Sequence, residues 1–458
     1  MSKVAREMPR SLLGRMLTNT AVLLGGKGFG AVCSFIYLAI LARSLGLKGF
    51  GHFSLIFGAA QALIAISGFE TWRVVVRYGA AHVHQKNWAA FGRLGMLAGV
   101  FDLVGAVFGC AIAYVVYFHF AQALGLNPEY RTGAFAITCI MLFALVSAPT
   151  GIVRALDRFD MAVYVEAIVP AGRLIAAVAI WLTEPTVLNF LLAWALIDVA
   201  EAIAYWAVAH RLCPEAVRLK HLSEWRQARR DNPGVGHFFL VTYAGASVDA
   251  ATKNGPLLVV GYLVGTSAAG LYRMASQLSQ GMSKLSTLLT RAAYAEVNRA
   301  HVSADLDEFR KLVRQTSLIA ALAGGGVVLL AVLLGKPLLG LIGGEEFRRA
   351  YIVLVPLTLA ASFELASVAF EPVLHATGRA RQALVARLVG LAAVALGILL
   401  FLGGGALDIA LAVAAGAAVT YAVLGLMGWH SLRMLKAMPE ILAEEVGADA
   451  LAPERGGG

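Results

Sequence analysis

Long apolar stretches follow one another along almost the whole chain and are separated by short segments rich in glycine and charged residues. An apolar helix of about 20 residues crosses the hydrocarbon core of a bilayer, which is about 30 Å thick. Stretches of this length predict transmembrane helices at residues 12–42, 51–75, 90–118, 132–153, 159–183, 187–210, 237–264, 268–293, 312–334, 348–375, 381–402 and 407–434. The pattern therefore predicts an all-α polytopic membrane protein of about twelve transmembrane helices.

The composition agrees with a bilayer as the solvent of this chain. Of its 458 residues, 59% are hydrophobic and only 14% are charged, more apolar surface than a soluble protein of this size could cover. The first apolar stretch is too long for the hydrophobic part of a signal peptide, so we expect it to remain in the mature protein. No external pair of cysteines is available, which predicts four free thiols.

The positive charge lies mainly on one side of the predicted membrane. Lysine and arginine are concentrated in the connections on the side of the N-terminus, which predicts that both termini are cytoplasmic and gives no reason to expect a nucleic-acid partner. The richest connection, residues 211–236, interleaves these residues with Leu219, Leu222 and Trp225. This mixture predicts an interfacial segment against anionic lipid head groups, with a dedicated partner-binding patch as the alternative.

The same basic connection divides the chain into two halves of six predicted helices. We expect an N-terminal lobe at 1–210, a cytoplasmic linker at 211–236, a C-terminal lobe at 237–434 and a cytoplasmic tail at 435–458. The motif G-x4-G-x-aromatic follows the first helix of each half, as GLKGFGHF from Gly46 and as GTSAAGLY from Gly265. An even number of helices in each half predicts two copies of the same orientation around a shared cavity, although a glycine pair can close any short turn.

Several charged residues fall inside the predicted helices, where each costs about 2.5–3.5 kcal/mol. Most of them must therefore face the protein interior or one another. The cations predict a substrate-binding cavity, and they are Lys27, Arg173, Lys253 and Arg273. The carboxylates predict either ion coupling or charge balance, and they are Asp198, Asp249, Glu364 and Glu371.

Three of these positions have competing interpretations. Asp249 and Lys253 are one helical turn apart and could neutralise each other as an ion pair. Arg173 lies two turns after Glu166, so it fits either an internal pair or a cavity cation. Arg273 lies closer to a helix end, from which its side chain could reach water.

Glycine and proline predict bends in two helices. Lys27 is surrounded by glycines in the string GGKGFG, and the helix at 237–264 contains a Gly-Pro pair. Proline interrupts the backbone hydrogen-bond ladder and glycine tolerates the resulting bend. Interrupted helices at equivalent places of two halves are typical of a transporter's binding site. The predicted hinge residues are Gly25, Gly26, Gly28, Gly255 and Pro256.

No residue pattern in the sequence indicates catalysis. The histidines are scattered, no cysteine and histidine spacing suits a metal, and GGKGFG lacks the spacing of a nucleotide-binding loop. We therefore expect no enzymatic activity, no metal and no cofactor. Movement of a substrate would then use an ion gradient, the membrane potential or the gradient of the substrate itself.

Several longer strings resemble a known family. They are LARSLGLKGFGHFSL, VVGYLVGTSAAGLYRMASQLSQGMSKL, VSADLDEFRKLVRQ, IGGEEFRRAYIVLVPL and EPVLHATGRAR. Over about residues 11–435 the chain resembles the polysaccharide or oligosaccharide flippases (Wzx-type O-antigen exporters) of the multidrug/oligosaccharidyl-lipid/polysaccharide (MOP) superfamily. The resemblance implies a V-shaped, MATE-like transporter fold in the bacterial inner membrane.

The resemblance also implies a function. Such a flippase turns an undecaprenyl-diphosphate-linked oligosaccharide, the repeat unit of O-antigen, exopolysaccharide or capsule, from the cytoplasmic to the periplasmic leaflet by alternating access. Lys27, Arg173 and Lys253 would then bind the diphosphate or acidic sugars. Na⁺ or H⁺ is the candidate coupling ion, and membrane lipid and polysaccharide polymerase machinery are the other candidate partners.

Two rival functions remain at this stage. A MATE-type multidrug exporter would favour a cavity of carboxylates and aromatics, whereas the cations here suit an anionic substrate. A membrane glycan polymerase or ligase is disfavoured by the short external connections. The related lipid II flippases typically have fourteen spans, so the twelve predicted here disfavour that substrate.

Overall fold

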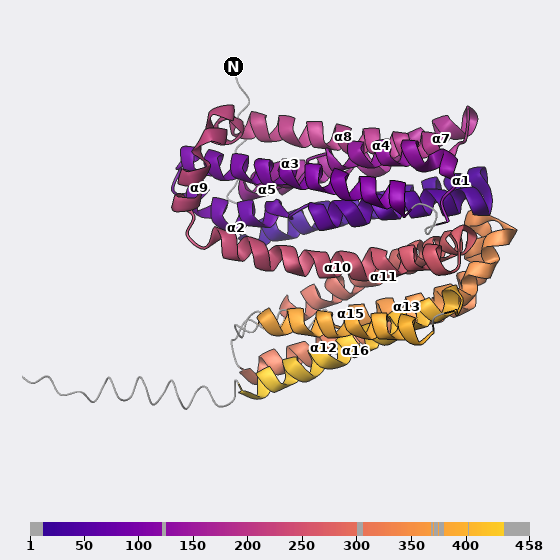
Figure 1. Cartoon of the computed structure of the whole chain (residues 1–458). Coiled ribbons are helices and arrows are strands. Elements are labelled where there is room, and N and C mark those ends of the chain that lie inside the picture. The colour runs from indigo at the N-terminus through magenta and orange to yellow at the C-terminus, as the bar shows by residue number, and fades with distance from the viewer. Residues whose placement is uncertain are drawn as a thin grey trace, which may run out of the picture. The chain divides into compact units, whose positions relative to one another are not determined.

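The computed structural model describes residues 12–120, 125–299, 306–367, 370, 374, 380–401 and 403–434, and this part of the chain contains no strand. The α-helices are α1 (Leu12–Ser67), α2 (Thr71–His84), α3 (Trp88–His119), α4 (Arg131–Leu142), α5 (Ser147–Ala155), α6 (Phe159–Glu166), α7 (Ile168–Leu182), α8 (Val187–Leu212), α9 (Trp225–Asp231), α10 (Val235–Leu263), α11 (Thr266–Arg299), α12 (Leu306–Gly343), α13 (Tyr351–Ser367), α15 (Ala380–Leu400) and α16 (Ala406–Met434). Short 3₁₀ helices are η1 (Pro128–Tyr130), η2 (Pro214–Val217), η3 (Leu219–Glu224) and η4 (Glu345–Ala350). Figure 1 shows their arrangement.

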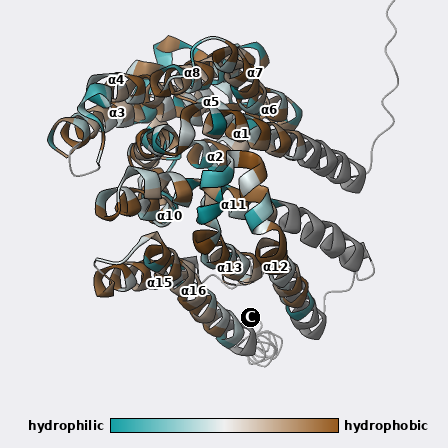
Figure 2. Cartoon of the chain, turned by 90° about the vertical axis from the view of Figure 1, so that its right-hand side faces the viewer, coloured by the Kyte–Doolittle hydropathy of each residue, from teal (hydrophilic) through white to brown (hydrophobic). Residues whose placement is uncertain are grey.

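These helices confirm the predicted all-α membrane fold. Nine helical segments in the described part are long and apolar enough to cross a membrane. The helices α10 and α11 are also long enough to cross a membrane, at 29 and 34 residues, and α11 is the more polar of the two. Figure 2 shows hydrophobic residues along most helices and a hydrophilic group on α11. Many large apolar side chains on the outer faces are exposed, as expected for a surface that faces lipid.

The chain forms two compact units. The first contains Met1–Met274 and Pro337–Ala350, and the second contains Ala275–Lys336 and Tyr351–Gly458. In the second unit, α13 and α15 both pack on α16, and Leu424 of α16 is buried in a cluster with Ala383 and Ala386 of α15. In the first unit, α10 packs on α1, although the sequence analysis assigned it to the C-terminal lobe. The division into two six-helix lobes stays a prediction.

The end of α12 belongs to the first unit because α1 holds it there. Arg43 on α1 donates hydrogen bonds to the carbonyls of Leu341 and Ile342, at 2.6 and 3.2 Å. These carbonyls lie in the last turn of α12, where a cation is favourable because of the helix dipole. Phe347 then packs edge-on against Phe50, with 5.4 Å between the ring centroids.

The two copies of the glycine motif take similar conformations and pack against each other. Gly46 and Gly265 both have positive φ, 64° and 108°, which glycine adopts without a steric penalty. A Cβ atom on Gly51 would overlap the backbone carbonyl of Thr266. A Cβ atom on Gly270 would lie 3.2 Å from the Cα of Gly51. The second glycine of each copy is therefore needed for close backbone packing, beyond closing a turn.

Two predicted helices are interrupted, which corrects the continuous spans expected at 51–75 and 132–153. The predicted span at 159–183 is divided into α6 and α7 only by Ala167, whose backbone angles stay helical (φ −70°, ψ −17°), so the two form one candidate span. The two breaks, at 68–70 and 143–146, face one buried residue of α3, Asp102. Its carboxylate accepts hydrogen bonds from Thr71 Oγ1 at 2.7 Å and from the Ala148 amide at 2.8 Å. Both donors lie at helix starts, where amides lack a partner within the helix and the dipole favours negative charge.

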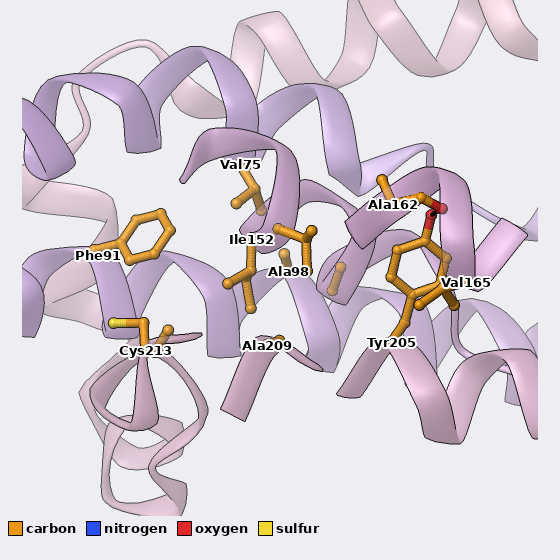
Figure 3. Packing of buried hydrophobic residues seen from close by; sticks show 12 residues of the cluster. Val75, Phe91, Ala98, Ile152, Ala162, Val165, Tyr205, Ala209 and Cys213 are labelled. Atoms are coloured by element: carbon orange, nitrogen blue, oxygen red, sulfur yellow. Dashed lines mark hydrogen bonds between the residues drawn. The ribbon is translucent and has the colours of Figure 1, made fainter. Parts of the chain in front are cut away.

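The interior of the first unit is apolar around these breaks. Residues from α2, α3, α5, α6 and α8 form one buried cluster that includes Phe91, Ile152 and Tyr205 (Figure 3). The hydroxyl of Tyr205 donates a hydrogen bond to the carbonyl of Ala162 at 3.3 Å. Cys213 lies at one end of this cluster, and all four cysteines are free thiols, as predicted.

Candidate functional site

A buried ion pair inside the first unit forms the centre of the candidate site. Arg173 on α7 donates from Nη2 to Asp198 Oδ1 on α8 at a distance of 2.7 Å. The two side chains are only 12% and 15% exposed. Nε of Arg173 is buried and has no hydrogen-bond partner in the described part of the chain. The pair is therefore held firmly, and the guanidinium retains donor capacity that the protein does not use.

Aromatic rings surround this ion pair and bring a second arginine to it. The guanidinium of Arg173 lies 5.4 Å from the ring centroid of Phe57 on α1 and 5.7 Å from that of Trp194 on α8. Arg273 on α11 lies 5.7 Å from the same Phe57 ring. Two guanidinium groups thus share one aromatic ring, an arrangement in which cation–π attraction offsets part of the cost of holding like charges close.

The position of Arg173 follows from the local sequence of α7. Pro170 lies in the first turn of this helix, where its missing amide hydrogen costs nothing. A Cβ atom on Gly30 of α1 would lie 3.5 Å from Cγ of Pro170, at ordinary van der Waals distance, so α1 and α7 pack in direct contact here. Arg173 comes less than one turn after this contact and points into the group of residues from α1 and α8.

A second ion pair lies along the same face of α8. Arg154 donates to Glu166 Oε1 at 2.8 Å, and the Tyr205 hydroxyl donates to the same oxygen at 3.2 Å. Asp198, Glu201 and Tyr205 are spaced i, i+3, i+7, so they follow one face of α8. Glu201 therefore lies between the two ion pairs.

The formal charges of this group balance. Three arginines, Arg154, Arg173 and Arg273, accompany three carboxylates, Glu166, Asp198 and Glu201. Two of the arginines are ion-paired, while Arg273 has no carboxylate within ion-pair distance in the part of the chain that the structure describes. Arg273 and Glu201 have no ion-pair partner among the described residues, so the group can bind an anion at the arginine or a proton at the carboxylate.

The structure brings together three of the eight predicted charged site residues, namely Arg173, Arg273 and Asp198. Asp249 and Lys253 lie on α10, with Asp249 half-buried and Lys253 exposed, and their ion pair stays a prediction. Glu364 is an exposed residue of α13 in the second unit. Lys27 lies on α1, but its side chain is outside the described part of the chain, and Glu371 is outside the described residues altogether.

The predicted hinges have helical backbones. Gly25, Gly26 and Gly28 lie within α1, whose backbone departs from helical angles at Gly46. Gly255 and Pro256 lie within α10, which continues from Val235 to Leu263. Bending at these positions stays a prediction.

Sequence reasoning missed part of this site. One interpretation paired Arg173 with Glu166 on a single helical face, which is wrong because Glu166 pairs with Arg154 and Arg173 pairs with Asp198. Phe57 and Trp194 gave no signal, since an aromatic residue in an apolar stretch is unremarkable. For Glu201 the sequence signal is its spacing of three residues from Asp198, which places both carboxylates on one helical face.

Other parts of the first unit offer weaker candidates. An open groove of about 590 Å³ is lined by Lys86, Asn87, Trp88, Ala89, Leu212, Cys213, Pro214 and Glu215. It lies at one end of α3 and α8 and contains none of the predicted site residues. Among the described residues no group of three or more His, Cys, Asp or Glu side chains could hold a metal.

A bundle of long apolar helices defines this chain as a multi-pass membrane protein, and charged residues buried inside such a bundle are typical of a transport pathway. Residues 16–294 match the family described as polysaccharide biosynthesis protein. The match covers more than half of the chain, so the chain belongs to this family, as its sequence strings indicated. It is 25% identical to inner membrane protein YghQ of Escherichia coli (strain K12) over 342 residues. This alignment covers 73% of this chain and 94% of that protein. The chain is accordingly a multi-pass inner-membrane protein.

Solved structures of the MOP superfamily share its fold. One is an inward-facing multidrug resistance MATE family transporter, with a TM-score of 0.65, 16% identity and coverage of 88% of this chain and 96% of that chain. Another is the lipid II flippase MurJ in an inward closed conformation, with a TM-score of 0.65, 13% identity and coverage of 91% and 92%. A third is a MOP superfamily transporter from Pyrococcus furiosus, described as having a binding pocket of reverse polarity, with a TM-score of 0.59, 17% identity and coverage of 91% and 96%.

Proposed function

We propose that this protein is a flippase that carries an undecaprenyl-diphosphate-linked oligosaccharide across the inner membrane by alternating access. The cargo would be a repeat unit of O-antigen, another lipopolysaccharide, exopolysaccharide or capsule. The observation that carries the proposal is the pair of arginines that share Phe57, one of which has no carboxylate partner among the described residues. Guanidinium groups bind phosphate oxygens through two parallel hydrogen bonds, which suits a diphosphate head group.

The ion pair supplies a way to couple binding to an ion. Asp198 occupies one Nη group of Arg173, so an incoming diphosphate would compete with it. A proton that binds Asp198 or the neighbouring Glu201 would remove one negative charge and free Arg173 for the phosphate. Loss of that proton would restore the ion pair and help to expel the cargo. Na⁺ bound between the two carboxylates would act in the same sense.

The proposed flippase function also gives the direction of transport and the partners. With both termini in the cytoplasm, the cargo would be loaded from the cytoplasmic leaflet while its polyprenyl chain stays in lipid. Lys27 and Lys253 would add positive charge along the route. Polysaccharide polymerase machinery would receive the cargo on the other side.

Substitutions of Arg273 test the proposal. In a strain that lacks its own flippase, Arg273→Gln should lose at least about 90% of glycan export, because an interaction with a charged group of about 1.5–3 kcal/mol disappears. Arg273→Lys should retain part of the activity, since it keeps the charge but not the two-pronged geometry. Arg349→Gln removes an exposed arginine from η4 and serves as the matched control. Full export by Arg273→Gln at normal membrane levels would refute the anionic-cargo site.

A MATE-type multidrug exporter is the second candidate. The likeness to MATE structures and the aromatic surface beside two carboxylates support it, because organic cations bind aromatic faces and carboxylates. Overexpression should then raise resistance to organic cations, and Glu201→Gln should abolish that resistance. A strain with unchanged drug resistance and lost glycan export would exclude this alternative.

A further inference from the structure

The basic linker between α8 and α10 packs against the helix bundle of the first unit. Its elements η2, η3 and α9 all pack on α3. Arg93 of α3 forms an ion pair with Asp231 of α9 at 2.8 Å. A Cβ atom on Gly92 would lie 2.5 Å from the carbonyl oxygen of Glu215 and 2.8 Å from the ring of His221, so the linker sits directly on the backbone of α3.

A buried histidine fixes the middle of the linker. His221 is almost completely buried, and each of its ring nitrogens lies beside a carboxylate. Nδ1 is 2.8 Å from Glu224 Oε2 and Nε2 is 3.2 Å from Glu215 Oε1. We name this arrangement of Glu215, His221 and Glu224 the clasp. It sets which side of η3 faces α3 and therefore which sides face outward.

The 3₁₀ geometry of η3 sorts the remaining side chains into stripes. With three residues per turn, side chains at i and i+3 lie directly above one another. Leu219, Leu222 and Trp225, the first residue after η3, form one such stripe, and they are 74%, 40% and 50% exposed. The next stripe contains Lys220, Ser223 and Arg226, which are all exposed.

The outer face thus combines an apolar stripe with a cationic one. The guanidinium of Arg226 lies 5.2 Å from the centroid of the Trp225 ring, so the two stripes meet there. Arg229 and Arg230 add two further exposed cations on α9. Exposed apolar groups beside positive charge are unfavourable against water but complementary to a bilayer surface, where tryptophan lies at head-group level and lysine or arginine meets anionic lipid.

The linker also lies at the right depth. It directly follows α8 and lies against the first turns of α3, two helices that are long and apolar enough to cross the membrane. Figure 1 shows α9 at the end of this bundle. The end of a spanning helix marks the boundary between hydrocarbon and head groups.

We propose that the stripes Leu219–Leu222–Trp225 and Lys220–Ser223–Arg226 form a docking surface for anionic lipid head groups. The apolar stripe would enter the boundary region while the cationic stripe recruits the anionic lipid. The proposal does not depend on which cargo the protein carries.

Quenching of Trp225 fluorescence by brominated lipids tests this surface in the full-length protein. The protein is reconstituted in phosphatidylcholine bilayers with an anionic minority of roughly one phosphatidylglycerol in five. Bromine, which quenches tryptophan, is carried either by all of the phosphatidylglycerol or by an equal amount of phosphatidylcholine. The chain has seven tryptophans, so the signal of Trp225 is the difference between the wild type and Trp225→Phe. We expect quenching of Trp225 to be roughly twofold stronger when the anionic lipid carries the bromine.

Variants of the cationic stripe separate head-group recognition from insertion. Ser223→Glu places a negative charge in this stripe while all three residues of the clasp are kept, and it should abolish the difference between the two labels. Ser223→Gln is its neutral control and Arg349→Gln its distant charge control, and both should keep the difference. Equal quenching by the two labels would refute recognition of the head group. Absence of Trp225 quenching would refute docking to lipid and would point to a protein partner.

Discussion

Asp102 offers the sharpest test of how this fold holds its broken helices together. In Asp102→Ala the Ala148 amide loses its acceptor, whereas Thr71 can still hydrogen-bond to Ser147 Oγ at 3.0 Å. A buried amide without a partner costs about 1–3 kcal/mol, and removal of the charge from two helix starts costs about 0.3–1 kcal/mol for each. We therefore expect Asp102→Ala to lower the free energy of unfolding by about 2–5 kcal/mol.

Asp102→Asn should be much milder. The asparagine carbonyl can accept from the Ala148 amide, and its NH₂ group can donate to Thr71 Oγ1 if that hydroxyl turns toward Ser147. Only the charge is then lost, so we expect a cost of about 1 kcal/mol. The order of stability should be wild type, then Asp102→Asn, then Asp102→Ala.

Thermal unfolding of the purified protein in detergent measures this order, with Glu184→Gln as a control because Glu184 is exposed. Unfolding of a large membrane protein is often irreversible, so the comparison uses midpoints at one heating rate. An Asp102→Ala variant as stable as the wild type would refute the role of Asp102. Equal losses in both variants would show that its charge matters rather than its hydrogen bonds.

Two further predictions concern the glycine motif and the clasp. Gly51→Ala should lower the unfolding midpoint more than Gly28→Ala, because a Cβ atom at Gly51 overlaps Thr266 whereas one at Gly28 meets nothing within 4 Å; equal midpoints would contradict this packing. In the clasp, hydrogen bonds from Lys220 to Glu215 and from His221 to Glu224 hold the pKa of both carboxyls below the ordinary value of 4.5. Its stability is therefore fully present above pH 4.5 and is lost as the pH falls through the lowered pKa values. Hydrogen exchange of residues 213–232 should show this loss, and equal protection at pH 6 and at about pH 3.5 would refute it.

The overall fold could be predicted because the bilayer imposes one strong rule. The described part of every predicted span is mainly α-helical, since a long apolar stretch has no other stable form in lipid. The breaks at 68–70 and 143–146 could not be predicted in this way. They depend on Asp102, a residue distant in sequence from both, and an isolated acidic residue in a span does not reveal its partners.

Three charged residues of the site could be identified from the sequence one by one, but their grouping could not. A charge in a span is costly enough to mark Arg173, Asp198 and Arg273 as functional candidates. Their arrangement depends on contacts between different helices, such as the ion pair of Arg173 with Asp198. It also depends on Phe57, which looks like any other lipid-facing or core residue in the sequence. The 3₁₀ register of η3 was equally hidden, because the expected interfacial helix would distribute the same residues differently around its axis.

The contact between Gly51 and Gly270 has a consequence for the history of the chain. These residues hold the same place in the two copies of the motif, and contact between equivalent positions is what a twofold axis produces in a symmetric dimer. If the two halves arose by duplication of a single copy, one glycine of the ancestor would have met itself across a subunit interface, and two codons would now encode what one had encoded. A larger side chain at either position would crowd the other copy of the motif, so the two codons would share one steric constraint.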